Sequence, residues 1–292
     1  MNTPSPPARE AAAEKPPPEP SDLSAALARR GGLSKDDLRR VALVQDQLGL
    51  GFIEAAMRLG LIAQADLDAV LSGNPVERAQ PTHAVRPATA LTSAQDPFDS
   101  FAENIRALRT ELLVRAPTGE ANVLVVMSAA SGDGRSRLAA ELAVSFAQLG
   151  QSTLLVDSDL RKAGQHHLFG ANNHEGLAQA LAQGRAPTLQ PVIGLPSLSL
   201  LTAGSKAATP LELLSDPILG ELLLGWKRRH RHIILDTPPT SLYSDGLAVA
   251  TYAGRVLVVS RKHQSRMAPM RDMIQRLGSA RATVVGAVLN NF

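Results

Sequence analysis

The sequence predicts an α/β fold in which a parallel sheet is flanked by helices, preceded by a small helical module. Two observations predict it. From residue 123 onward, short β-branched runs alternate with amphipathic helical stretches, which is typical of a parallel sheet covered on both faces. Before residue 98 there is no such alternation, and apolar residues recur at helical spacing between two proline-rich stretches.

The composition is that of a globular protein. Of the 292 residues, 44% are hydrophobic and only 3% aromatic, and none is cysteine. The lack of cysteine excludes a disulfide framework, thiolate zinc sites, iron–sulfur clusters and a cysteine nucleophile. With few aromatic rings and a net charge of +3, we expect no nucleic-acid partner. No apolar run approaches the roughly 20 residues of a spanning helix, so we expect a partner to provide any membrane attachment.

Three segments precede the predicted α/β domain. Residues 1–20 carry seven of the twenty prolines and are predicted to be disordered. Residues 21–73 are predicted to form the small helical module, for which we expect a docking role, with a simple spacer as the alternative. Residues 74–97 contain four prolines and are predicted to be a linker. The α/β domain itself is predicted over residues 98–292.

Within that domain, a helix is predicted first, because Ser100 and Glu103 have the spacing of a capping box before an apolar stripe. Strands are then predicted at residues 123–127, 153–156, 198–201, 232–235, 256–259 and 283–289. Helices are predicted at residues 136–149, 211–229 and 267–277. Ligands of such sheets bind at the carboxyl ends of the strands, so functional residues are expected directly after strands.

A glycine-rich loop follows the first predicted strand and opens the next helix, which is the position of a phosphate-binding loop. Gly132 and Gly134 would let backbone N–H groups turn toward phosphate oxygens, and Ser136 lies where a hydroxyl would bind Mg²⁺. The match to GxxxxGK[ST] is imperfect, because Ala129 replaces the first glycine and Arg135 replaces the lysine. Taken alone, the segment fits a glycine-rich turn without a ligand equally well.

Acidic residues close two further strands. Asp157 and Asp159 follow the second strand, and positions i and i+2 of an extended segment share one side, so both are expected to face the loop. There they would hold a metal or deprotonate a nucleophile. Asp236 ends an apolar strand in the Walker B pattern, which reaches Mg²⁺ through that acid. Surface acids at strand ends are the alternative, but three such motifs on one sheet are far more specific than one.

Together these motifs resemble the bacterial tyrosine kinases, P-loop ATPases of the deviant Walker type that partner chain-length determinant proteins in exopolysaccharide synthesis and export. Residues 103–110, ENIRALRT, are similar to the E-x-x-R-x-L-R-T helix of that family. Residues 154–161, LLVDSDLR, are similar to its second Walker motif. The segments DTPP at 236–239 and GAVLN at 286–290 also fit. The resemblance covers residues 98–292.

The resemblance implies ATP and Mg²⁺ as ligands and a role for each motif. Asp157, Asp159 and Asp236 would be catalytic: Asp159 would activate the attacking hydroxyl, and Asp157 and Asp236 would hold the metal with Ser136. Glu103, Arg106 and Arg109 would lie in a helix that contacts other subunits or a partner. The nucleotide would be bound by Ser131, Gly132, Asp133, Gly134, Arg135, Ser136 and Arg137, with Asn290 at the adenine.

The implied function is an ATP-binding tyrosine-kinase-like protein that acts with a membrane chain-length determinant in exopolysaccharide or capsule synthesis and export. It would be cytoplasmic and peripheral at the inner membrane through that partner, and the resemblance also allows a homo-oligomer. A catalytically weak nucleotide-binding regulator is the alternative, because Arg135 keeps the charge of the loop lysine but not its geometry. A partitioning-type ATPase is less favoured, because those proteins carry an extra lysine early in the loop, where this chain has Ala-Ala-Ser.

Positive charge is clustered in two places, KRRHRH at residues 227–232 and RKH at residues 261–263. A solvated helix end and loop is the favoured interpretation of such runs. An anionic partner or lipid headgroup is the alternative.

Overall fold

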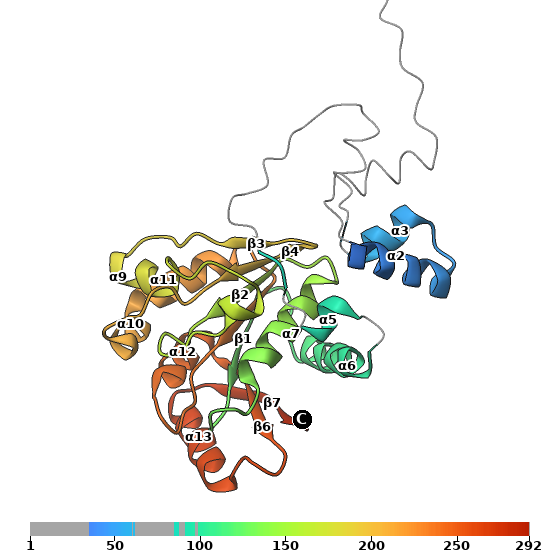
Figure 1. The fold of residues 1–292 in the computed structure, drawn as a ribbon. Helices are drawn as coiled ribbons and strands as arrows, with labels where there is room; N and C mark the ends of the chain where they lie inside the picture. The colour runs from blue at the N-terminus through green and yellow to red at the C-terminus, as the bar shows by residue number, and fades with distance from the viewer. Residues whose placement is uncertain (1–34, 60, 62–84, 88–90, 97–98, 292) are drawn as a thin grey trace, which may run out of the picture.

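The computed structural model describes residues 35–59, 61, 85–87, 91–96 and 99–291 (Figure 1). The tail predicted over residues 1–20 lies outside the described residues. The described part of the predicted module contains two helices, α2 (Lys35–Leu48) and α3 (Phe52–Arg58), which pack around Val41, Val44, Ala55 and Ala56. Among the described residues, no helix combines the length and hydropathy needed to cross a bilayer.

The domain contains a seven-stranded sheet with the order β3-β4-β2-β5-β1-β6-β7. Neighbouring strands are parallel, except that β3 runs antiparallel to β4. The predicted parallel α/β fold is therefore confirmed. The strands are β1 (Asn122–Met127), β2 (Thr153–Asp157), β3 (Gln190–Val192), β4 (Leu195–Leu201), β5 (His232–Asp236), β6 (Arg255–Arg261) and β7 (Thr283–Asn290).

Side chains alternate between two apolar cores along each central strand, as the two-residue repeat of a β-strand requires. In β1, Leu124 and Val126 face one core, whereas Val123, Val125 and Met127 face the other. The first core packs under α5 (Thr92–Gln95), α6 (Ser100–Val114) and α7 (Arg135–Ala147). The second packs under α9 (Leu177–Gln183), α10 (Pro210–Ser215), α11 (Pro217–Lys227), α12 (Asp245–Ala253) and α13 (Met267–Ser279). Figure 1 shows α5 to α7 gathered on one side of the sheet.

The structure breaks the single helix predicted at 211–229 into α10 and α11. Pro217 has no N–H to continue a helix, and it forces the preceding Asp216 into extended backbone with φ −68° and ψ 137°. The Asp216 side chain then caps α11 by accepting a hydrogen bond from the Ile218 N–H at 2.9 Å. The sequence pattern missed β3, since a three-residue edge strand with a central proline has little strand character.

The predicted capping box of α6 is wrong. The N-cap is Asp99, whose carboxylate accepts a hydrogen bond from the Phe101 N–H at 2.7 Å, and Ser100 is already the first helical residue. Glu103 instead forms an ion pair with Arg106 one turn further on. Asp at an N-cap is as favourable as Ser, so the sequence offered two adjacent candidates for one position.

Part of the predicted linker is built into the domain. Val85 extends the sheet edge beside β3: its N–H donates to the Pro191 carbonyl at 2.9 Å, and its carbonyl accepts from the Ile193 N–H at 2.7 Å. Leu91 and Ala94 are buried in the core under α7. The described segments 85–87 and 91–96 therefore belong to the α/β domain, which begins before residue 98.

Candidate functional site

The fold brings the predicted motifs together at the carboxyl ends of three adjacent strands. The loop 128–134 follows β1, Asp157 is the last residue of β2, and Asp236 is the last residue of β5. Strand β5 lies between β2 and β1, and Asp157 and Asp236 are direct partners across the β2–β5 pairing. These are the positions where ligands of an open α/β sheet bind.

The glycines of the loop adopt the left-handed backbone that the prediction required, with φ of +84° at Gly132 and +92° at Gly134. Asp133 fixes the loop from within: its buried carboxylate accepts hydrogen bonds from the Ala130 N–H at 3.1 Å and from the Ser265 hydroxyl at 2.7 Å. The loop is thus held in one shape, with α7 beginning directly behind it.

Asn290 lies beside this loop at the end of β7. Its side-chain amide donates to the Asp133 carbonyl at 2.7 Å, so the amide nitrogen is already engaged within the protein. The adenine contact predicted for Asn290 stays a prediction. Ser131 and Gly132 form the exposed crest of the loop.

Arg135 lies on the floor of the loop with only 7% of its surface exposed. Its guanidinium donates to the Thr237 carbonyl at 2.9 Å, the Ser128 hydroxyl at 2.5 Å and the Ala130 carbonyl at 2.7 Å. Burial lowers the pKa of Arg135, and the carboxylates of Asp236, Asp159 and Asp133 oppose that shift. The cation is therefore held by three fixed acceptors within the protein.

Arg137 does not lie on the floor of the loop with Arg135. Its guanidinium donates to the Thr92 hydroxyl at 3.2 Å and lies 5.2 Å from the centre of the Phe101 ring. The side chain is thus directed toward α5 and α6. The predicted phosphate contact of Arg137 is not supported by this orientation.

Asp236 is fully buried and has one unsatisfied oxygen. Its Oδ2 accepts from the Gln165 side-chain amide at 2.7 Å, whereas Oδ1 has no hydrogen-bond partner among the described residues. Burial raises the pKa of Asp236 to about 6, against the opposing effect of the Ser136 hydroxyl and the Gln165 amide. A buried carboxylate oxygen without a partner, beside a hydroxyl, suits a hard cation such as Mg²⁺. The residues present therefore fit the predicted metal.

Asp157 is engaged by the backbone around it, and its predicted role at the metal stays a prediction. Its two oxygens accept three backbone hydrogen bonds, from the N–H groups of Asp159 at 3.1 Å, Gly164 at 2.9 Å and Gln165 at 3.0 Å. Burial, and then the charge of Asp236, raise its pKa well above the ordinary value. Asp157 thereby shapes the turn that carries Gln165 to Asp236, which is a positioning role.

Asp159 lies close to Asp157 for a different reason than predicted. Strand β2 ends at Asp157, so the alternation of an extended segment does not reach Asp159. The chain turns instead, and the Asp159 carboxylate accepts from the N–H groups of Arg161 at 3.2 Å and Lys162 at 2.8 Å. Burial raises the pKa of Asp159, which is the direction a general base near neutral pH needs.

Sequence reasoning missed two residues that build this site. Gln165 donates through one amide nitrogen to both the Ser136 carbonyl at 2.9 Å and Asp236, so it ties the loop helix to the Walker B acid. Asp245 holds Arg161 through two hydrogen bonds of 2.6 and 3.1 Å. Neither carries a motif signal of its own. For Asp245, the available signal was its position as the first residue of α12, where an acidic residue is favoured. The sequence analysis did not predict that helix.

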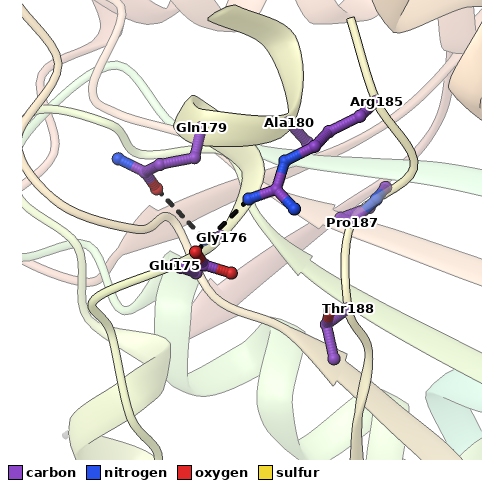
Figure 2. A pocket seen from close by; sticks show the side chains of 7 residues that line it. All are labelled: Glu175, Gly176, Gln179, Ala180, Arg185, Pro187 and Thr188. Carbon is purple, nitrogen blue, oxygen red and sulfur yellow. Dashed lines mark hydrogen bonds and ion pairs between the residues drawn. The ribbon is translucent and has the colours of Figure 1, made fainter. Parts of the chain in front are cut away.

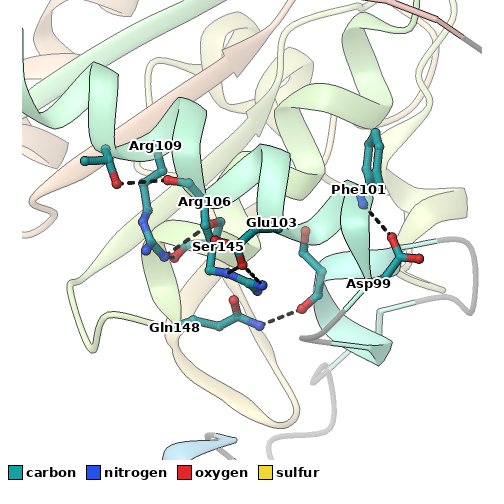
Figure 3. A network of polar contacts seen from close by, with 9 residues as sticks. Asp99, Phe101, Glu103, Arg106, Arg109, Ser145 and Gln148 are labelled. Atoms are coloured by element: carbon teal, nitrogen blue, oxygen red, sulfur yellow. Dashed lines mark hydrogen bonds and ion pairs between the residues drawn. The ribbon is translucent and has the colours of Figure 1, made fainter.

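The three residues predicted to make subunit contacts on α6 divide into two groups (Figure 3). Glu103 and Arg106 form an ion pair on the outer surface, where the Glu103 side chain is 69% exposed. Arg109 points inward and donates to the carbonyl and hydroxyl of Ser145 on α7, at 2.7 and 3.1 Å. Arg109 is thus a helix-packing residue, and Glu103 and Arg106 remain available to a partner.

A shallow pocket lies away from this site, beside α9 (Figure 2). Arg185 forms an ion pair with Glu175 at 3.3 Å across it, and the Gly176 N–H donates to the Gln179 side chain at 3.0 Å. Glycine is required at position 176, because a Cβ there would lie 2.3 Å from the Thr202 carbonyl oxygen. These polar contacts join the pocket's own lining residues, and we assign no ligand to it. Within the described residues, no three His, Asp or Glu side chains gather as a metal site.

The comparisons with known proteins first define the class. The fold matches the septum site-determining protein MinD from Pyrococcus horikoshii in complex with Mg-ADP, with a TM-score of 0.50 and 20% identity over 58% of this chain and 70% of that one. This similarity shows the fold alone. Together with the glycine-rich loop after β1 and the acids that end β2 and β5, it defines the class as an α/β P-loop fold.

More specific similarity leads to tyrosine kinases. The kinase domain of the Escherichia coli tyrosine kinase ETK matches with a TM-score of 0.65 and 31% identity, over 69% of this chain and 79% of that domain. The chain belongs to the bacterial tyrosine kinase family. It is also 34% identical over 202 residues to the tyrosine-protein kinase etk of Escherichia coli K12, and 30% identical to wzc of Salmonella typhi. The alignment covers 68–69% of this chain but only 27–28% of those relatives, about a quarter of their length. No protein-family model matches the chain.

The loop assignment predicts the effect of a single glycine substitution. Gly134→Val forces a β-branched residue into φ +92°, so the N–H groups of the loop turn away from the nucleotide. We expect Mg-ADP affinity, measured by calorimetry, to fall at least about a hundredfold. Gly119→Val is the matched control, because Gly119 has φ +77° in a turn with open space around it, remote from the loop. Equal losses in the two variants would contradict the assignment.

Proposed function

We propose that this protein binds ATP with Mg²⁺ and acts as a tyrosine-kinase-like partner of a membrane chain-length determinant in exopolysaccharide or capsule synthesis and export. The family membership and the arrangement of the loop, Asp159 and Asp236 support the nucleotide-binding part of this proposal. The proposal places the protein in the cytoplasm, peripheral at the inner membrane. The helical module within residues 21–73 is proposed to be a docking element.

In this proposal each residue has a defined task. The N–H groups of residues 131–136 bind the phosphates, and the start of α7 adds its partial positive charge. Ser136 and Asp236 would hold Mg²⁺, which when bound neutralises charge that develops on the phosphates. Asp159 would accept the proton of the attacking hydroxyl. Asp157 positions Gln165, and Gln165 positions Asp236.

The observation that carries our assignment of low intrinsic activity is the position of Arg135. Three hydrogen bonds hold its guanidinium against fixed protein acceptors. A held cation still attracts a phosphate, so nucleotide affinity persists. Transfer requires a cation that is placed for the transition state rather than for the ground state, and the planar guanidinium is fixed elsewhere. We therefore favour a nucleotide-dependent regulator with slow phosphoryl transfer.

The proposal is tested by steady-state ATP hydrolysis and by phosphorylation of a tyrosine-containing polymer such as poly(Glu,Tyr). Both are measured with and without the cytoplasmic segment of a membrane chain-length determinant from the same organism. We expect Mg-ATP binding with slow turnover for the isolated protein and faster turnover with the segment. Failure to bind Mg-ATP would overturn the proposal. Robust turnover without the segment would overturn the regulator assignment and leave a self-sufficient kinase.

The outward-facing pair of α6 leads to a prediction about assembly. Arg106→Glu replaces the exposed ion pair with two like charges and should shift sedimentation toward smaller species in the presence of the partner segment. Because the pair is exposed, we expect the free energy of unfolding to change by less than about 1 kcal/mol. Arg109→Ala removes two hydrogen bonds to Ser145 and should lower the free energy of unfolding by about 1–3 kcal/mol.

The matched control for the assembly prediction is Arg271→Glu, an equal charge change at an exposed position of α13. Sedimentation of this variant should match that of the wild type. If Arg106→Glu and Arg271→Glu sediment alike, α6 is an ordinary packing helix and does not form a contact surface.

A further inference from the structure

The end of the sheet opposite the nucleotide loop forms one continuous surface. We define the amino-end face as residues 115–121, 148–152, 228–231, 254–255 and 280–282, which lead into β1, β2, β5, β6 and β7. Hydrogen bonds join these segments. The Arg231 N–H donates to the Ser152 carbonyl at 2.8 Å, the Thr283 N–H to the Gly254 carbonyl at 2.8 Å, and the Arg255 guanidinium to the Arg115 carbonyl at 2.6 Å.

The amino-end face is strongly basic. Its acidic residue is Glu120, against six arginines: Arg115, Arg228, Arg229, Arg231, Arg255 and Arg281. All of these arginines are exposed except Arg255, which is half-buried. Arg115 pairs with Glu111 of α6 at 2.8 Å. Arg231 and Arg255 donate to neutral oxygens, so these contacts orient their guanidinium groups without neutralising them.

Exposed aliphatic side chains lie among these cations. Val114, next to Arg115, is 79% exposed, and Leu149, within the face, is 44% exposed. Leu224, one turn before the end of α11, is 58% exposed. Helices α6, α7, α11, α12 and α13 all end at this face, and their dipoles favour arginines there. The dipoles give no reason for exposed valine and leucine.

We propose that the amino-end face binds the surface of an anionic lipid bilayer. Arginines that attract acidic headgroups, together with aliphatic side chains that enter the boundary of the acyl region, are the two components of interfacial membrane binding. The five segments contain no Phe, Tyr or Trp on which bases could stack, and the ring of His230 is half-buried, which disfavours single-stranded nucleic acid. Because the strands are five to eight residues long, apart from β3, the nucleotide loop would face away from the bilayer, roughly 20 Å from it. This binding does not depend on phosphoryl transfer.

The test is co-sedimentation of the full chain with vesicles at low ionic strength, without nucleotide. Vesicles of phosphatidylcholine alone are compared with vesicles that also contain phosphatidylglycerol, and we expect binding to the anionic ones. Each surface cation contributes about a fivefold factor, so the double variant Arg228→Glu, Arg229→Glu should bind at least about thirtyfold more weakly. The matched control is Lys206→Glu, Lys262→Glu, with the same charge change at exposed positions of the opposite end, which should bind within about twofold of the wild type.

A second pair of measurements separates a bilayer from a soluble acidic partner. Val114→Ser with Leu149→Ser leaves the charge unchanged and should weaken vesicle binding about tenfold, while binding of poly-aspartate stays the same. The proposal is overturned if the protein does not prefer anionic vesicles. It is also overturned if the lysine control variant loses as much vesicle affinity as the Arg228→Glu, Arg229→Glu variant. It is equally overturned if the aliphatic changes have no effect and poly-aspartate or a DNA duplex displaces the vesicles, because the face would then bind an acidic macromolecule.

Discussion

Replacing Arg135 with lysine is expected to raise the turnover of bound ATP about a hundredfold, while nucleotide affinity changes by less than about threefold. In the structure the guanidinium is fixed by the carbonyls of Thr237 and Ala130 and by the Ser128 hydroxyl. Arg135 reaches these acceptors from two nitrogens of its planar fork, whereas a lysine ammonium is a single point charge on a flexible stem and can follow the phosphates. The lysine is expected to stabilise the transition state more than the bound substrate. The change should therefore raise the turnover rate rather than the nucleotide affinity.

Arg137→Lys is the matched control for this change. It replaces the same group two residues away, where the guanidinium is directed to Thr92 and Phe101. We expect turnover within about twofold of the wild type. If wild type and Arg135→Lys turn over equally fast, Arg135 is a working substitute for lysine. If Arg135→Lys stays inert even with the partner segment, the low activity has another cause than Arg135.

Asp236→Asn should have the second large effect. The change removes the charge of the acid that, with Ser136, would hold Mg²⁺, so the gain in ATP affinity on adding Mg²⁺ should vanish. Any turnover should fall about a hundredfold to a thousandfold. The measurement is nucleotide titration with Mg²⁺ and with EDTA, in parallel with Asp216→Asn, which removes an exposed helix-capping acid far from the loop. A Mg²⁺ effect that survives in Asp236→Asn would remove Asp236 from the metal site.

The same variant should be more stable than the wild type without nucleotide at neutral pH. Burial raises the pKa of Asp236 from 3.8 to about 6. The folded state therefore holds a proton that the unfolded chain has released, so stability falls as pH rises from about 4 to about 6. The loss is on the order of 3 kcal/mol above that range. In thermal unfolding, the stability of Asp236→Asn relative to the wild type should increase between pH 4 and 6 and then stay constant. A gain that is equal at pH 4 and pH 7 would contradict this origin.

The fold could be predicted because its strongest signals are local. Buried β-branched runs such as those of β1 and β5 identify strands by themselves, and amphipathic stretches between them require a parallel sheet. Where prediction failed, two local signals competed or none was present. Asp99 and Ser100 are adjacent candidates for one N-cap, and β3 holds only three residues around a proline. The inclusion of Leu91 in the core depends on long-range packing, which sequence spacing does not express.

The positions of the site residues could be predicted better than their roles. The loop and the acids at strand ends follow from the sheet topology, so Gly132, Gly134 and Asp236 lie where the motifs place them. The roles depend on which partners fill each hydrogen-bonding position. Asp157 is committed to three backbone N–H groups, and Arg109 is committed to Ser145. Such partners come from distant segments that only the folded chain brings together.

We propose that the loop of residues 128–136 binds Mg-nucleotide with Arg135 in place of lysine. The decisive measurement is calorimetric titration of Mg-ADP into the wild-type chain of 292 residues. We expect saturable binding at one site per chain, with a dissociation constant in the micromolar range that rises when EDTA removes Mg²⁺. A flat titration at concentrations up to about 1 mM would contradict it, because Arg135 would then fill the loop in place of the phosphates.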